Sequence, residues 1–348
     1  MNSDFYAPSE VSRQDAALPP NEDNTAEIRR HFSKLGLAYL VMTAAFMAAA
    51  YGLQYAVWLL HPSLLSEWWF SWAVSLLPLY GVGLPLLLLL LRRVPASPHN
   101  TDYTLRGVTD EKPRFHVGHW LILLAIAFAC TTAGSVVGNI IMAVLSAVMD
   151  YDYAFSLNSM VQSTPVWFTF VCTCICAPLG EELLFRKLLI DRTRRYGDLT
   201  SILLSGLLFG LFHGNLFQFF YAAMVGMILA YVYTRSGKYW WCVAMHAAIN
   251  LMGSIVIPSL AAYLPTAPGS AMDLRALLVS LVILLWQYGM LACGIALLCV
   301  FLGRRKLSVG RESPEEKRRF SVILLNPGMI AYGIVLILLL LVSLIPVR

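Results

Sequence analysis

Nine apolar runs, separated by polar or basic segments, constrain this chain more than any other feature of its sequence. A helix needs about 20 apolar residues to cross the hydrocarbon core of a bilayer, and most of the runs reach that length. They lie at about 35–60, 68–91, 117–147, 164–190, 198–213, 215–234, 239–257, 274–302 and 322–346. We therefore predict an all-α fold, a polytopic transmembrane helical bundle of eight to nine spans. The count depends on whether the short run 198–213 crosses fully.

Composition supports the membrane class. Of the 348 residues, 58% are hydrophobic and only 13% are charged, which leaves too little polar surface for a soluble domain of this size. Residues 1–33 are polar and rich in Asn, Asp and Pro, so we expect a disordered N-terminal tail. The first apolar run is then an uncleaved helix and not a signal peptide.

The basic residues fall on alternate connections between the runs. Segments 1–34, 92–114, 186–195, 235–238 and 304–319 together hold 23 of the 25 Lys and Arg residues. Because cytoplasmic loops carry an excess of Lys and Arg, this alternation supports nine helices with a cytoplasmic N-terminus. The net charge of +5 is therefore explained by topology and does not indicate nucleic-acid binding.

We expect four parts in the chain. The tail 1–33 precedes two transmembrane helices and a cytoplasmic loop (34–116), a motif-bearing helical core (117–257), and two C-terminal helices joined by a basic loop (258–348). The seven cysteines all lie in apolar runs, where small residues pack between helices, so we predict neither a disulfide framework nor a cysteine metal site.

Glu181 and Glu182 lie inside an apolar run, whereas the other acidic residues lie in tails, loops or span boundaries. An ionisable group at membrane depth costs several kcal/mol unless it is paired or hydrated. Arg186 follows Glu182 by one helical turn and can hold its carboxylate in a forked pair. Glu181 lies about 100° around the helix and lacks that partner. We interpret Glu182–Arg186 as a structural ion pair and Glu181 as a proton acceptor.

Two histidines in later runs extend this set. His213 closes the fifth run, and His246 lies in the seventh run with Asn250 one turn later on the same face. Polar residues in membrane spans face the bundle interior, so we expect these side chains and the two glutamates to converge on one cavity. Helix geometry alone leaves a spread in depth of ~12 Å between the histidines, which tilt and a short fifth helix would have to close.

This set suits hydrolysis of a peptide bond, which needs an activated water, an oxyanion stabiliser and a proton for the leaving amine. Glu181 serves as general base and His213 positions the water or shuttles the proton. His246 and Asn250 present donors to the oxyanion. In an alternative interpretation, Glu181, His213 and His246 bind a catalytic Zn²⁺. The His-Glu-x-x-His signature of soluble metalloproteases is absent from the sequence.

Three motifs resemble those of one known family. Glu181-Glu182-x-x-x-Arg186, Phe209-x-x-x-His213 and His246-x-x-x-Asn250 occur in this order on separate runs. They are similar to the motifs of the CPBP family, the CAAX proteases and bacteriocin-processing (ABI) intramembrane proteases related to type II CAAX prenyl endopeptidases. The resemblance covers about residues 118–257.

The resemblance implies an intramembrane endopeptidase, of the metallo- or glutamate type, with its site open to the cytosol. It implies Glu181 with His213 as water activators and His246 with Asn250 as the oxyanion pair; Zn²⁺ remains open. Lys187 departs from the family, whose members commonly carry a small residue there.

We expect a multi-pass protein of a bacterial cell membrane, with the lipid bilayer and a membrane-associated protein or peptide substrate as partners and no nucleic acid. A non-catalytic scaffold or bacteriocin-immunity protein of the family is one rival interpretation. The other is a proton-coupled transporter, which typically shows internal repeats.

Overall fold

The computed structural model describes residues 22–96, 103–104, 115–151, 164–265, 272–302, 307, 309–310, 314 and 316–345. Seven of the helices in these ranges are long and apolar enough to cross a membrane. Two shorter apolar helices, Asp198–Phe212 and Pro327–Val342, complete the series. The predicted α-helical membrane bundle is therefore confirmed, and the chain is an integral membrane protein. The run at 198–213 forms a helix of 15 residues, the short member expected from the sequence.

The helices follow the apolar runs closely. The first half of the chain contains α1 (Glu22–Leu60), the 3-10 turn η2 (Pro62–Ser66), α2 (Phe70–Pro78), the π-turn η3 (Leu79–Gly83), α3 (Leu84–Leu91), strand β1 (Tyr103–Thr104) and α4 (Val117–Met149). The motif-bearing region begins with one continuous helix made of α6 (Val166–Thr169), the π-turn η4 (Phe170–Cys176), α7 (Ala177–Glu182), the π-turn η5 (Leu183–Leu188), α8 (Leu189–Thr193) and the 3-10 turn η6 (Arg194–Tyr196). We call it the central helix.

Later elements complete the bundle. They are α9 (Asp198–Phe212), α10 (Leu216–Ser236), α11 (Tyr239–Leu251), the π-turn η7 (Met252–Val256), α12 (Ile257–Ala261), α13 (Leu274–Leu302), β2 (Val309–Gly310), the 3-10 turn η8 (Glu316–Arg318), α14 (Arg319–Leu324) and α15 (Pro327–Val342). The run predicted as one span at 322–346 is broken at Asn326. Its side chain accepts a hydrogen bond from the backbone N–H of Met329 and so starts a new helix there.

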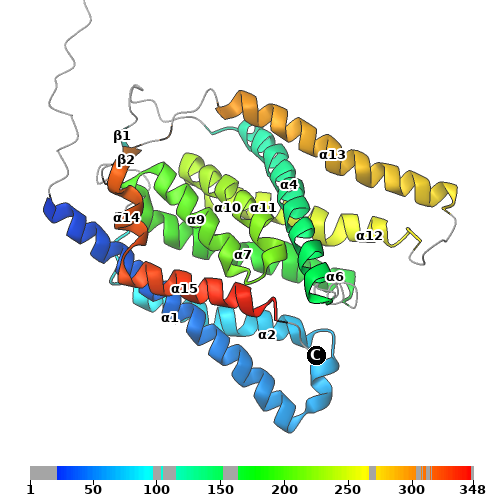
Figure 1. Ribbon diagram of the computed structural model, residues 1–348, viewed down its shortest axis with the longest axis horizontal. Helices are drawn as coiled ribbons and strands as arrows, with labels where there is room; N and C mark the ends of the chain where they lie inside the picture. The colour runs from blue at the N-terminus through cyan, green and yellow to red at the C-terminus, as the bar shows by residue number, and fades with distance from the viewer. Residues whose placement is uncertain are drawn as a thin grey trace, which may run out of the picture.

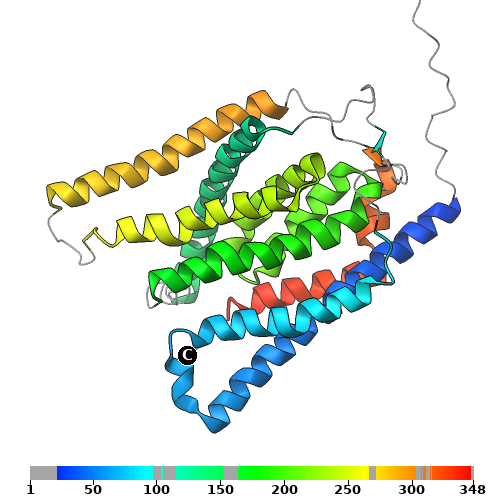
Figure 2. The same ribbon diagram turned by 180° about the vertical axis from the view of Figure 1, so that it is seen from behind.

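The bundle has a motif-bearing middle and two flanks (Figures 1 and 2). In both views the central helix lies with α9, α10 and α11, while α13 lies at one outer edge and α1 with α15 at the other. α4 crosses the middle and packs against both α10 and α13. The helices that carry the three motifs thereby lie between the two flanks of the bundle.

The basic segments gather at one end of the molecule. Arg192 in the central helix donates to the carbonyls of Leu91 and Val94 after α3, at 3.2 and 3.1 Å. Arg235 at the end of α10 pairs with Asp198 at the start of α9, at 3.4 Å. β1 and β2 pair in antiparallel fashion and join the two long basic loops. This is the end that we expect to face the cytoplasm.

The predicted limit of the N-terminal tail is wrong. Residues 22–33, expected to be disordered, form the first turns of α1, and residues 1–21 lie outside the described residues. Ile28 and Phe32, one turn apart, are buried in the core. His31 Nε2 donates to the carbonyl of Arg192 at 2.8 Å, and its Nδ1 accepts from Arg195 at 2.9 Å. Tertiary docking therefore orders a segment whose composition suggested disorder.

A tight hairpin joins α9 to α10 and places His213 at its turn. Gly214 has φ +64°, a conformation that favours glycine. Asn215 then caps α10 by accepting from the backbone N–H of Gln218 at 2.9 Å. A Cβ on Gly210 would come within 2.8 Å of Ala223 in α10, so glycine permits the close packing of these two helices.

Candidate active site

The site is built on wide turns of the central helix. π-turns η4 and η5 flank α7, which carries Glu181 and Glu182. Such turns are rare and occur frequently at functional sites. In η4 the backbone N–H of Ala177 bonds to the carbonyl of Cys172, five residues back. In the same register, the carbonyl of Thr173 would need an N–H from residue 178, which is proline and has none.

Asn250 supplies the missing donor. Its side-chain Nδ2 donates to the carbonyl oxygen of Thr173 at 2.7 Å. A backbone carbonyl left without a donor inside a membrane bundle is costly, so this bond connects α11 firmly to the central helix. One of the two amide N–H groups of Asn250 is thereby occupied.

Side chains from other helices also donate hydrogen bonds to backbone carbonyls of the central helix. Carbonyls at Cys176, Leu179, Leu184 and Phe185 accept hydrogen bonds from Tyr80, Tyr239, Tyr39 and Ser205, in that order. These four donors were not predicted from the sequence. Their only sequence signal is a hydroxyl within or at the end of an apolar run, and the acceptors become apparent only from the π-turns.

Glu182 and Arg186 form the predicted ion pair. Arg186 Nε lies 2.9 Å from Glu182 Oε2, and both side chains are 0% exposed. The guanidinium also lies 4.6 Å from the centre of the Phe209 ring and donates to Ser205 Oγ at 3.5 Å. The pairing is consistent with the cost of burying either charge alone.

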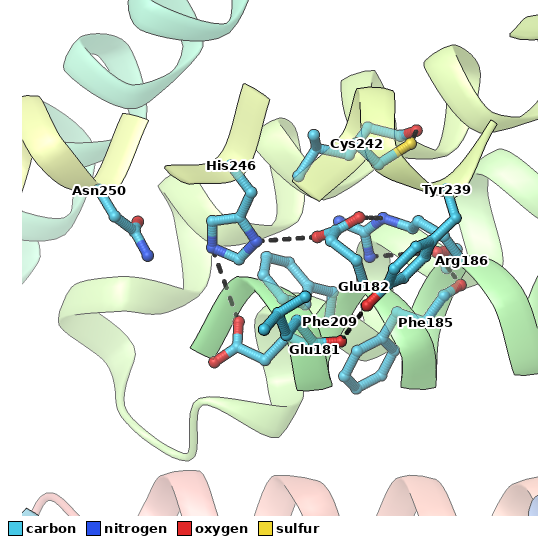
Figure 3. Close-up of polar contacts among 12 residues, drawn as sticks. Glu181, Glu182, Phe185, Arg186, Phe209, Tyr239, Cys242, His246 and Asn250 are labelled. Carbon is cyan, nitrogen blue, oxygen red and sulfur yellow. Dashed lines mark hydrogen bonds and ion pairs between the residues drawn. The ribbon is translucent and has the colours of Figure 1, made fainter. Parts of the chain in front are cut away.

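Glu182 has a second partner that the sequence did not indicate. Its Oε1 accepts a hydrogen bond from His246 Nδ1 at 2.8 Å. The other ring nitrogen, Nε2, lies 3.7 Å from Oε2 of Glu181, whose side chain is 20% exposed. Figure 3 shows the result as a continuous chain from Arg186 through Glu182 and His246 to Glu181. His246 therefore lies at the same depth as the two glutamates.

The ring of Phe209 lies in contact with both His213 and His246 and so connects His213 to this set of charged groups. Its Nδ1 donates to the carbonyl of Phe209 at 2.8 Å, which leaves Nε2 as the acceptor of a neutral imidazole. The Phe209 ring lies edge-on to both histidine rings, with centroids 4.8 Å from His213 and 5.7 Å from His246. The three motifs therefore converge, although direct polar contacts among the described residues join only the first and third.

Lys187, the departure from the family pattern, points to a different partner. Its ammonium lies 2.6 Å from Asp191, and its side chain is half exposed. It therefore leaves the Glu182–Arg186 pair undisturbed.

A metal site can be tested from the donor set. Both histidines donate through Nδ1 to an oxygen acceptor, so Nε2 is the atom that could bind a metal, the arrangement that metal-bound histidines usually show. However, across the part of the chain that the structure describes, no group of three His, Cys, Asp or Glu side chains is placed to hold a metal ion. Glu181, His213 and His246 are not gathered as a set of three ligands, so the residues present do not fit the alternative zinc interpretation.

Fold and site together define a class: a polytopic α-helical membrane protein with a buried carboxylate–imidazole centre. Residues 163–252 match the family model described as type II CAAX prenyl endopeptidase Rce1-like. This segment contains all three motifs, and the match supports the family resemblance predicted from them. The search of curated proteins and the search of solved structures each found no match.

Proposed function

We propose that this protein is an intramembrane endopeptidase that hydrolyses a peptide bond of a membrane-associated protein or peptide. The observation that carries the proposal is the chain of charged groups from Arg186 to Glu181, within the segment that matches the endopeptidase family. Ionisable residues at membrane depth are expensive and mark functional sites. Here each one has a partner that orients it.

Glu181 is the general base in this mechanism. It is the more exposed of the two glutamates, and its Oε2 lies beside His246 Nε2 without a short hydrogen bond. It takes a proton from water while the water oxygen bonds to the peptide carbonyl carbon. When the C–N bond breaks, the same proton passes from Glu181 to the leaving amine, which restores the carboxylate.

His246 stabilises the oxyanion. Glu182 fixes the ring by accepting from Nδ1, and Arg186 in turn fixes Glu182. When both ring nitrogens carry a proton, Nε2 donates to the oxyanion. His213, with Nε2 as acceptor, orients the attacking water. The second N–H of Asn250 is the further donor that we assign to the oxyanion.

The mechanism contains no metal step, because the three donors are not gathered as ligands. Purified enzyme treated with a strong chelator should retain its activity. Loss of activity with the chelator and recovery with Zn²⁺ would instead support the zinc-assisted interpretation.

We propose a bacterial cell membrane as the location, with leader or signalling peptides as substrates alongside prenylated proteins.

Comparative proteomics of membranes tests the proposal. Cells carry the wild type, Glu181→Gln, or Glu67→Gln as a matched control in which an exposed carboxylate far from the site is removed. New peptide termini should appear with the wild type and with Glu67→Gln and vanish with Glu181→Gln. Identical termini in all three would contradict hydrolysis. They would favour a scaffold or a transporter, both of which leave termini unchanged.

A further inference from the structure

A basic pocket lies between α1 and the start of α15, at the end of the molecule where the basic segments gather. Its volume is about 260 Å³, and Arg29, Arg30 and Lys34 line it together with Ser33 and Asn326. The three cations lie on exposed positions of α1. Among the described residues, none of them pairs with a carboxylate, in contrast to Arg186, Lys187 and Arg235.

Close packing of two glycines builds the pocket. A Cβ on Gly36 would lie 2.5 Å from the backbone of Gly328, and one on Gly328 would clash with the carbonyl of Ser33. α15 can therefore begin directly against α1, and the two helices lie side by side in Figures 1 and 2. The positive end of the α15 dipole adds to the charge of the three cations.

Polar donors and apolar surface adjoin the cations. Ser33 Oγ accepts from the backbone N–H of Gly328 at 3.0 Å, so its own proton remains to be donated. Arg30, Lys34, Leu37 and Val41 follow at intervals of four, three and four residues and so share one face of α1. Leu37 and Val41 are exposed large apolar residues below the pocket. Leu325, also exposed, lines the pocket itself.

We propose that this pocket binds the phosphate headgroup of an anionic lipid, with an acyl chain along Leu37 and Val41. Unpaired Arg and Lys side chains supply charge-assisted hydrogen bonds to phosphate. Basic pockets between helices at the cytoplasmic face suit such headgroups. The apolar stripe of Leu37 and Val41 next to the cations favours a lipid over free phosphate, because only a lipid has an acyl chain that would bury this apolar surface. The lipid would tie α1 to α15.

Lipid titration of the full-length protein in neutral detergent micelles tests the site. Native mass spectrometry counts bound dioleoyl phosphatidylglycerol, with dioleoyl phosphatidylcholine as the neutral lipid and inorganic phosphate as the soluble anion. The pocket variant carries Arg29→Gln, Arg30→Gln and Lys34→Gln. The matched control carries Arg92→Gln, Arg93→Gln and Lys238→Gln, which remove the same charge from the same end of the molecule.

The wild type should retain phosphatidylglycerol over phosphatidylcholine, and excess inorganic phosphate should not displace it. The pocket variant should bind the anionic lipid at least ~10-fold more weakly, while the control stays within about twofold of the wild type. Arg30→Glu, a single exposed reversal, should show a smaller loss in the same direction. Equal losses in both triple variants, no preference in the wild type, or displacement by inorganic phosphate would overturn the proposal.

Discussion

The central helix and α13 are both long apolar helices, yet they differ in almost every other respect. In the central helix, Val166–Tyr196, the most apolar 18-residue window has a mean hydropathy of 1.5, and 44% of that window is buried inside the protein. α13 reaches a mean hydropathy of 2.1, but only 6% of its window is buried. Hydropathy alone would therefore rank the outer helix as the better membrane span.

The difference shows where this protein can hold charge. Neighbouring helices surround the central helix and give partners to its carboxylates, its guanidinium and its freed carbonyls. α13 packs on α4 along one side, where a Cβ on Gly294 would clash with the side chain of Ala129. Its remaining side chains are largely exposed and apolar, as expected of a helix that faces lipid.

The largest expected effect is on activity. Glu181→Gln should lower kcat/KM by about 10²- to 10⁴-fold, because the amide cannot accept the proton of the attacking water. His213→Ala should also lose most activity. Cleavage of the peptide recovered from membranes measures both. Unchanged activity in either variant would remove that residue from the mechanism, whereas Leu285→Ala in α13 should cleave like the wild type.

A second contrast uses two ion pairs of the same spacing on the central helix. Arg186→Met leaves Glu182 buried without its guanidinium, so the free energy of unfolding should fall by about 3 kcal/mol. Lys187→Met removes a half-exposed partner of Asp191 and should cost at most ~1 kcal/mol. Unfolding by denaturant in detergent micelles compares them. Similar losses would show that burial does not set the strength of these pairs.

Asn250 and Pro178 provide a third contrast. Asn250→Ala should destabilise the protein by about 1 kcal/mol, because the Thr173 carbonyl loses its donor. Pro178→Ala returns a backbone N–H at the position that would serve that carbonyl. The loss caused by Asn250→Ala should therefore shrink in the Pro178→Ala background. Equal losses in both backgrounds would show that the proline does not create the need for Asn250.

The smallest effect belongs to the outer helix. Leu285→Ala in α13 should change the free energy of unfolding by less than ~0.5 kcal/mol, because this side chain is 64% exposed and faces an environment as apolar as itself. Leu189→Ala in the central helix, where the side chain is 1% exposed, should cost about 2–5 kcal/mol. Equal losses in the free energy of unfolding for Leu285→Ala and Leu189→Ala would mean that protein, and not lipid, covers this face of α13.

Local patterns were sufficient to predict the helices and the Glu182–Arg186 pair. Apolar runs set most helix bounds to within a few residues, and the spacing of four placed Arg186 on Glu182. The sequence could not show that Glu182 also orients His246, because that bond joins residues 64 apart across two helices. The start of α1 was missed because Ile28 and Phe32 gain their burial only from the rest of the bundle.

The side chains that donate to backbone carbonyls of the central helix could not be predicted from the sequence either. Pro178 signals a missing N–H, but which carbonyl loses its partner depends on the register of the π-turn. That register is a property of the packed helix, so the donors Tyr39, Tyr80, Tyr239 and Asn250 could be assigned only from the structure. The alternative zinc interpretation shows the converse: the sequence contains suitable ligand types, but among the residues that the structure describes no three of them lie close enough to hold a metal ion.

The central claim is that Glu181 and His246 act as one catalytic unit, and a double-mutant cycle tests it most directly. Glu181→Gln, His246→Ala and the double variant are purified, confirmed as folded, and compared with the wild type in kcat/KM on the same membrane peptide. Residues that act as a unit lose activity non-additively. We predict that the double variant is no slower than the slower single variant. Losses that multiply, or a His246→Ala variant as active as the wild type, would contradict the account.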